Sequence, residues 1–260
     1  MFYFFVFIFG NIIGSYLNVI IFRLQKKERI ITKHSHCPHC QKNLAAKDLI
    51  PIASFFILKG RCRYCSQKIS WQYPLLEAAA GLVFILITYN TIGGLGWSML
   101  FISSSVFWLW VRNLVFASFL IIIFIYDLRW YLILDKITLP AMVAALLFNL
   151  FLGFNLINLL IAALIAFGFF FIQFSLSRGR WIGGGDLRLG ALMGLMLGWP
   201  NILVALFFAY IIGAVCSLLL VAFGQKGFKS QMPFGTFLTL GTLIALLYGE
   251  TIISWYLRLF

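Results

Sequence analysis

The chain has 260 residues, of which 63% are apolar and only 10% are charged, and its mean hydropathy is +1.01. A soluble domain is about half apolar and about a quarter charged, so this composition excludes a water-soluble globule and predicts an integral membrane protein. The net charge of +13 does not indicate nucleic-acid binding, because basic residues gather in the cytoplasmic loops of membrane proteins.

Long apolar runs recur along the chain, and a bilayer core needs about 20 apolar residues in a helix. The first run, residues 1–22, has no basic leader region and no small-residue cleavage site, so it is predicted to span the membrane rather than to be removed. Glycines four apart, Gly10 with Gly14 and Gly190 with Gly194, predict close helix packing. Eight transmembrane helices are predicted, at residues 1–22, 73–91, 97–126, 137–153, 155–176, 187–199, 201–223 and 235–257.

The loop between the first two spans, residues 23–72, holds 11 Lys and Arg. The positive-inside rule places this loop in the cytoplasm, and alternation of eight spans then puts nearly every other basic residue on the same side, with both termini outside. We therefore expect an all-α polytopic membrane protein in three parts: a first transmembrane helix at 1–22, a cytoplasmic insert at 23–72 and a transmembrane core at 73–260.

Four of the five cysteines lie in this loop as two Cys-x2-Cys pairs separated by 21 residues: Cys37 with Cys40, and Cys62 with Cys65. Each pair can place two thiolates on one ion, and two pairs complete a tetrahedral structural zinc site. A redox dithiol is the alternative, but it would not need two pairs. The histidines around the first pair are not predicted to be ligands, because cysteines already fill four positions: His34, His36 and His39.

Acidic residues are rare in this chain, which has only seven, and acids beside a bilayer core are costly and usually functional. Asp127 ends the apolar run of the third predicted span, and Asp186 opens the sixth. Both fall at the cytoplasmic ends of spans, where two nearby carboxylates would share a proton and activate water as an aspartic dyad. Alternatively, Asp186 caps a helix and Asp127 neutralises Arg129.

Three consecutive glycines come directly before Asp186. They permit an unusual backbone and leave space for an extended substrate strand. The predicted substrate-approach loop is Gly183, Gly184 and Gly185.

The run GGGDLRLG, which contains Asp186, resembles the GxGD motif of type IV prepilin peptidases, and the run from Tyr126 to Asp135 resembles the family's other acidic segment. The resemblance implies that Asp127 and Asp186 are catalytic, with Asp135 as the runner-up. It extends over nearly the whole chain, although Thr236 stands where the family commonly has proline. It leaves open which aspartate acts as the base.

The resemblance also implies the substrates, the location and a second activity. The substrates would be prepilin or pseudopilin precursors, cut at the cytoplasmic face of a bacterial inner membrane, and the new N-terminus would be methylated with S-adenosylmethionine. No glycine-rich cofactor loop can be placed in the sequence, and Glu77 is only a candidate contributor. The alternatives are a peptidase without methyltransferase activity, a transporter and a non-catalytic assembly factor.

Overall fold

The computed structural model describes residues 1–29, 35–92, 103–225, 227 and 230–259, and within them the chain is all-helical apart from two isolated β-bridges. The predicted all-α class is therefore confirmed. The chain divides into two compact units, Met1–Val106 and Phe107–Phe260.

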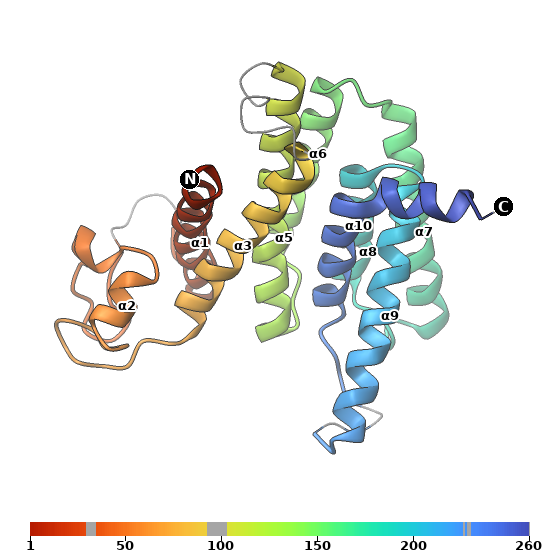
Figure 1. Ribbon diagram of the computed structural model, residues 1–260. Coiled ribbons are helices and arrows are strands. Elements are labelled where there is room, and N and C mark those ends of the chain that lie inside the picture. The colour runs from red at the N-terminus through yellow and green to blue at the C-terminus, as the bar shows by residue number, and fades with distance from the viewer. Residues whose placement is uncertain (30–34, 93–102, 226, 228–229, 260) are drawn as a thin grey trace. The chain divides into compact units, whose positions relative to one another are not determined.

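The first unit is built on an antiparallel pair of helices, α1 (Phe2–Lys26) and α3 (Gln72–Ile92) (Figure 1). Predicted close packing is confirmed here, since a Cβ on Gly10 would lie 2.7 Å from the Cα of Gly81. A Cβ on Gly14 would lie 2.9 Å from the Cα of Glu77. The loop between the two helices contains a short 3₁₀ helix, η1 (Ala46–Asp48), and a short α-helix, α2 (Ala53–Ile57).

The second unit is a bundle in which a short helix, α8, contacts four longer ones: α6, α7, α9 and α10 (Figure 1). Glycines allow this contact, because a Cβ on Gly194 would lie 2.3 Å from the backbone nitrogen of Ala163 on α7. The helices of this unit are α5 (Ser104–Trp130), α6 (Asp135–Phe151), α7 (Leu156–Ser177), α8 (Gly184–Leu197), α9 (Asn201–Ala222) and α10 (Phe234–Leu257).

The predicted count of eight spans is wrong. Within the described residues, six helices are long and apolar enough to cross a membrane: α1, α3, α5, α7, α9 and α10. The other two predicted spans are α6, with 17 residues, and α8, with 14. At 1.5 Å per residue they are only about 26 Å and about 21 Å long, against roughly 30 Å of hydrocarbon. The start of the predicted span 97–126, up to residue 102, lies outside the described residues.

Candidate active site and metal site

Asp127 lies in the last turn of α5, and α10 provides its hydrogen-bond donors. Its residue exposure is 4%, and its Oδ2 accepts a hydrogen bond of 2.8 Å from the backbone N–H of Thr236. The N–H of Gly235 donates to the same carboxylate. The first N–H groups of a helix have no partner within the helix and favour a negative charge. The beginning of α10 is therefore a binding site for the Asp127 carboxylate.

Asp186 is the third residue of α8 and is 7% exposed. Its Oδ2 accepts a hydrogen bond of 3.0 Å from the N–H of Gly183, and its own N–H donates to the carbonyl of Gly183 at 3.1 Å. An acid in the first turn is stabilised by the positive end of the helix dipole. The local sequence thus both begins α8 and fixes the carboxyl group.

The fold brings these two aspartates to one end of the second unit. Burial above all, and to a smaller extent the neighbouring Asp127, oppose ionisation of Asp186. Ile133, in the connection after α5, lies beside Gly185, which precedes Asp186, and beside Gly235, which donates to Asp127. A Cβ on Gly185 would be 2.9 Å from Ile133 Cβ, and a Cβ on Gly235 would be 2.9 Å from Ile133 Cδ1. Two buried carboxyl groups in such proximity cannot both ionise cheaply, so the pair is suited to hold one proton.

The glycines before Asp186 have ordinary backbone torsions. None of the three is among the residues with positive φ, and Gly183 is extended at φ −79° and ψ 154°. The glycines permit an unusual backbone but do not use it, and the predicted loop is largely a helix start, because Gly184 and Gly185 belong to the first turn of α8. Room for another chain is present, because a Cβ on Gly184 would meet nothing within 4 Å.

Asp135, the runner-up, has a different environment. It is the first residue of α6, its side chain is 51% exposed, and it forms an ion pair with Arg188 of α8. Neither burial nor a second carboxyl group acts on Asp135 as they do on Asp127 and Asp186. The structure thus separates Asp135 from the two buried aspartates.

Gly235 and Thr236 are the functional residues that sequence reasoning missed. The run Pro233-Phe234-Gly235 is similar to the corresponding run of type IV prepilin peptidases, but it carries no acid, so the sequence predicts no catalytic role for it. A Cβ on Gly235 would lie 2.9 Å from Asp127 Oδ2 and 3.0 Å from its Cγ, so only glycine fits this contact. The available signal was a proline directly before a helix, which marks a helix start with free N–H groups.

The four loop cysteines form a compact cluster in the first unit. All four Sγ atoms lie within 4.8 Å of one another, and Cys37 Sγ and Cys65 Sγ are 3.9 Å apart. Tetrahedral zinc with Zn–S bonds of about 2.3 Å would space the sulfurs about 3.8 Å apart. The cluster therefore fits a metal ion of this kind. Cys216 on α9 is not part of it.

Each cysteine pair is held by the same backbone turn. The N–H of Cys37 donates to the carbonyl of Lys42, and the N–H of Cys62 donates to the carbonyl of Gln67. The turn residues Gln41 and Ser66 both have positive φ, of 59° and 57°. Isolated β-bridges close the two turns, between His36 and Asn43 and between Arg61 and Lys68.

The thiol groups of the second pair ionise differently. Burial opposes ionisation of Cys62, but backbone N–H donors of Tyr64 and Cys65 and the neighbouring thiols bring its pKa down to about 7. The Gln67 N–H favours the Cys65 thiolate, yet burial and the three other cysteines raise the Cys65 pKa to about 11. Such crowding of thiols is relieved when a cation binds them.

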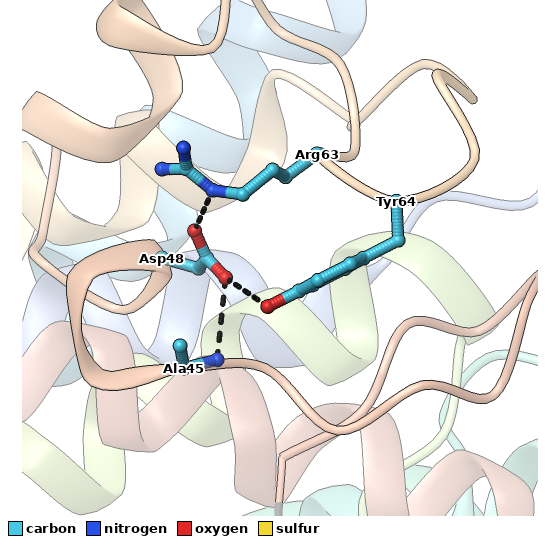
Figure 2. A network of polar contacts seen from close by, with 4 residues as sticks. All are labelled: Ala45, Asp48, Arg63 and Tyr64. Atoms are coloured by element: carbon cyan, nitrogen blue, oxygen red, sulfur yellow. Dashed lines mark hydrogen bonds and ion pairs between the residues drawn. The ribbon is translucent and has the colours of Figure 1, made fainter.

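Asp48 of η1 links the segment between the two cysteine pairs to the second pair (Figure 2). Its Oδ1 accepts from Arg63 Nε at 2.6 Å, and its Oδ2 accepts from the Tyr64 hydroxyl at 3.0 Å and the Ala45 N–H at 3.2 Å. The Arg63 hydrogen bond lowers the pKa of Asp48 below its ordinary value. Because Arg63 and Tyr64 are the two residues between Cys62 and Cys65, Asp48 orients the second cysteine pair.

Two family models match the chain. The bacterial peptidase A24 N-terminal domain matches residues 8–91, and the type IV leader peptidase family matches residues 114–218. The first match contains the four cysteines, and the second contains Asp127 and Asp186.

Relatives with the printed name prepilin leader peptidase/N-methyltransferase match nearly the full length. The chain is 32% identical to one from Bacillus subtilis (strain 168), covering 98% of this chain and 97% of the relative. It is 30% identical to one from Aeromonas hydrophila, covering 98% and 93%, and 30% identical to one from Legionella pneumophila, covering 96% and 92%. No solved structure matches the chain.

Proposed function

The chain belongs to the type IV leader peptidase family, and on this basis we propose that it is a bacterial prepilin leader peptidase that also methylates the new N-terminus of its product. The observation that carries the peptidase activity is the meeting of two buried carboxyl groups, Asp127 and Asp186, at one end of the helical bundle. Two such groups can hydrolyse a peptide bond without a covalent intermediate.

In the proposed reaction Asp127 is the base and Asp186 the acid. Two N–H groups of α10 donate to Asp127 and favour its ionised form, whereas one N–H, that of Gly183, donates to Asp186. Asp127 takes a proton from water, whose oxygen attacks the carbonyl carbon, while Asp186 gives its proton to the carbonyl oxygen. When the intermediate collapses, the C–N bond breaks, the proton on Asp127 passes to the leaving amine, and the former carbonyl oxygen returns its proton to Asp186 as the C=O bond of the new carboxyl group forms.

The substrate would pass the glycines at the start of α8. Space beside Gly184 supports this placement, because an extended strand needs backbone room next to the reacting carbonyl. The peptide would then lie across Asp186 with its scissile bond between the two carboxyl groups. The apolar helix that follows a pilin leader is suited to remain in the bilayer, so only the leader junction has to leave it.

The cysteine cluster is proposed to hold a structural zinc ion in Cys37, Cys40, Cys62 and Cys65. Four thiolates complete the tetrahedron and leave no open position for a substrate, so the ion would stabilise the loop rather than take part in hydrolysis. Because this loop has few buried apolar residues, four metal–sulfur bonds would stabilise its folded state.

We place the protein in the bacterial inner membrane with the dyad and the cysteine module on the cytoplasmic side. The 11 basic residues of the 23–72 loop support this orientation. The relatives' name includes N-methyltransferase, and S-adenosylmethionine would supply the methyl group on its sulfonium centre.

The test is reconstitution of the purified protein with a prepilin that carries its leader, followed by mass measurement of the product N-terminus. The proposal predicts cleavage with or without S-adenosylmethionine, and a methyl mass only in its presence. Cleavage that never gives a methyl mass would restrict the function to a peptidase. No cleavage of several different prepilins would point to a non-catalytic assembly factor.

A further inference from the structure

Two adjacent polar contacts join α1 to α3 at the end of the pair where the cysteine loop leaves. Asn18 Nδ2 donates to the carbonyl of Tyr73 at 3.2 Å, and the Ser15 hydroxyl donates to the Glu77 carboxylate. Ser15 and Asn18 are three residues apart on α1, and Tyr73 and Glu77 are four apart on α3. Residues at these spacings are neighbours on a helix face, with Cβ atoms about 5–6 Å apart.

The Glu77 carboxylate is buried without a cation. It is 7% exposed, and its Oε2 accepts from the backbone N–H of Ile52 at 2.7 Å. This donor and the Ser15 hydroxyl are both neutral, and no ion pair of Glu77 is found within the part of the chain that the structure describes. A buried carboxylate is normally paired with a positive group, and the Glu77 carboxylate lacks such a partner.

The amide oxygen of Asn18 also lacks a partner. The residue is 2% exposed, and its Oδ1 has no hydrogen-bond partner in the part of the chain that the structure describes. Buried acceptors almost always have a donor. Asn18 Oδ1 on α1 and the Glu77 carboxylate on the facing helix α3 are thus two buried acceptors at the same end of the helix pair, and one positively charged donor group would complete them.

We propose that Asn18 and Glu77 bind a primary ammonium group during methylation. This inference rests on the proposed function and gives it a second site, in the first unit of the chain. Two participants carry such a group: the cleaved product, at its new N-terminus, and S-adenosylmethionine, on its α-carbon. An ammonium ion offers three donors, which matches a carboxylate oxygen and an amide oxygen side by side.

For the product, this site also accounts for the proton. The N-terminal ammonium has no lone pair and cannot be methylated until it loses a proton. Glu77 accepts that proton, the freed amine forms a bond to the methyl carbon, and the methyl–sulfur bond breaks to leave a neutral thioether. The methylated nitrogen is again positively charged, so atoms and charge balance.

A purely structural role for Glu77 has to be separated from this one. Its bond to Ile52 tethers the loop that contains the cysteines, and Ile52 has a φ of 60°, which is unusual for a β-branched residue. The variant Glu77→Gln separates the two roles. The amide oxygen of glutamine can still accept from Ile52 and Ser15, but it carries no charge and takes no proton.

The experiment measures binding and turnover with the full-length protein in detergent. The probes are a synthetic mature pilin N-terminal peptide with a free amine, the same peptide with an acetylated amine, and S-adenosylhomocysteine. Wild type should prefer the free amine over the acetylated one by roughly 10- to 100-fold, the effect of one charge-assisted hydrogen-bond pair. In Glu77→Gln this preference should disappear and methylation should be lost, while leader cleavage and metal content stay unchanged.

Charge relocation provides the second variant. Adding Asn18→Asp to Glu77→Gln returns a carboxylate to the same end of the helix pair, on the facing helix α1, and should restore part of the amine preference. Loss of S-adenosylhomocysteine binding, instead of the amine preference, would assign the ammonium to the methyl donor. The matched control is Thr88→Val, a buried threonine further along α3 whose hydroxyl donates to the Phe84 carbonyl of its own helix, and both activities should survive it.

Two results would overturn the inference. The first is a Glu77→Gln variant that keeps the amine preference, S-adenosylhomocysteine binding and methylation. Glu77 would then have only its structural role of holding Ile52. The other is wild type that binds free and acetylated peptides equally and whose S-adenosylhomocysteine binding does not depend on Glu77. Failure of the proposed function would look different, because wild type would then not cleave, or would cleave without methylating.

Discussion

Gly235 is the residue on which the environment of Asp127 depends most closely. A methyl group at this position would lie 2.9 Å from Asp127 Oδ2 and 2.9 Å from Ile133 Cδ1. We expect Gly235→Ala to displace the carboxylate and to lower the cleavage rate by roughly 100-fold, as sub-ångström to ångström misplacement of a catalytic group does. The control is Gly168→Ala on α7, where a Cβ meets nothing within 4 Å, and steady-state cleavage of a prepilin is the measurement.

Asp48 governs the second cysteine pair through Arg63 and Tyr64. Asp48→Asn should weaken metal binding by about 10- to 100-fold, as loss of a group that orients metal ligands does, and chelator competition measures this. Because the pKa of Asp48 is lowered in the fold, its contribution is complete above its ordinary value of 3.8 and is lost only as pH falls below it. The difference between Asp48→Asn and wild type should therefore not change between pH 6 and 8.

The sequence alone predicted the cysteine cluster, which the structure brings together, since few chemical alternatives exist for paired Cys-x2-Cys motifs. It also singled out Asp127 and Asp186, whose catalytic role stays a prediction. It did not predict the donors to Asp127. Thr236 lies 109 positions from Asp127, and its contribution is a backbone N–H, which leaves no side-chain signature. Likewise, nothing in the local sequence marks Ile133 as the neighbour of both glycine positions.

At the scale of elements, α8 is held at both ends. Its first turn carries Asp186, and its last carbonyls, those of Leu195 and Met196, accept from Asn149 Nδ2 of α6 at 2.6 and 3.4 Å. Arg112, buried in α5, donates to Asn149 Oδ1 at 2.9 Å. A positive charge near the C-terminal end of a helix is favourable, so this network stabilises the position of the helix that carries Asp186.

This network predicts which of its variants loses the most stability. Asn149→Leu leaves the Arg112 guanidinium buried with one acceptor fewer and should destabilise the fold by about 3 kcal/mol. Arg112→Met removes the charge itself and should cost less, and adding it to Asn149→Leu should recover part of the loss. Unfolding in detergent, followed by circular dichroism, tests the order. Equal costs for the two single variants with strict additivity would contradict it.

The lengths of α6 and α8 are where the expected arrangement of spans was wrong. Apolar residues continue through both segments, so composition alone made them look like full spans. Their ends are set by Asp135 and Gly184 on one side and by the turns after Phe151 and Leu197 on the other. A hydropathy pattern does not show that neighbouring helices enclose a short helix, which removes its need to match the bilayer.

At the scale of the whole molecule, the chain combines a loop with four clustered cysteines on a helix pair with a bundle that carries two buried acids. The charge pattern predicts one orientation for both. Cysteines introduced as Gln25→Cys at the end of α1 and Asn90→Cys at the end of α3, in a Cys216→Ala background that keeps the four loop cysteines, should add labelling by an impermeant maleimide from opposite sides of the membrane. Gln25→Cys should be labelled only when the reagent reaches the cytoplasm. Labelling from outside would reverse the orientation.

Removal of the metal should affect the two units unequally. If the ion holds only the loop, chelation should unfold the loop around Cys37 and Cys62 while the bundle with Asp127 and Asp186 keeps its helices. We expect protease sensitivity to rise between residues 35 and 70 and to stay low in α5–α10. Equal loss of protection throughout the chain would show that the metal stabilises both units together.

The most direct measurement compares prepilin cleavage by wild type with cleavage by three variants: Asp127→Asn, Asp186→Asn and Asp135→Asn. The first two keep the size and hydrogen-bonding capacity of the side chain but remove the titrating group. We predict that both abolish cleavage, whereas Asp135→Asn retains it because Asp135 is exposed and paired with Arg188. Cleavage that survives Asp127→Asn or Asp186→Asn would contradict the account, and its loss only in Asp135→Asn would transfer the catalytic role to that residue.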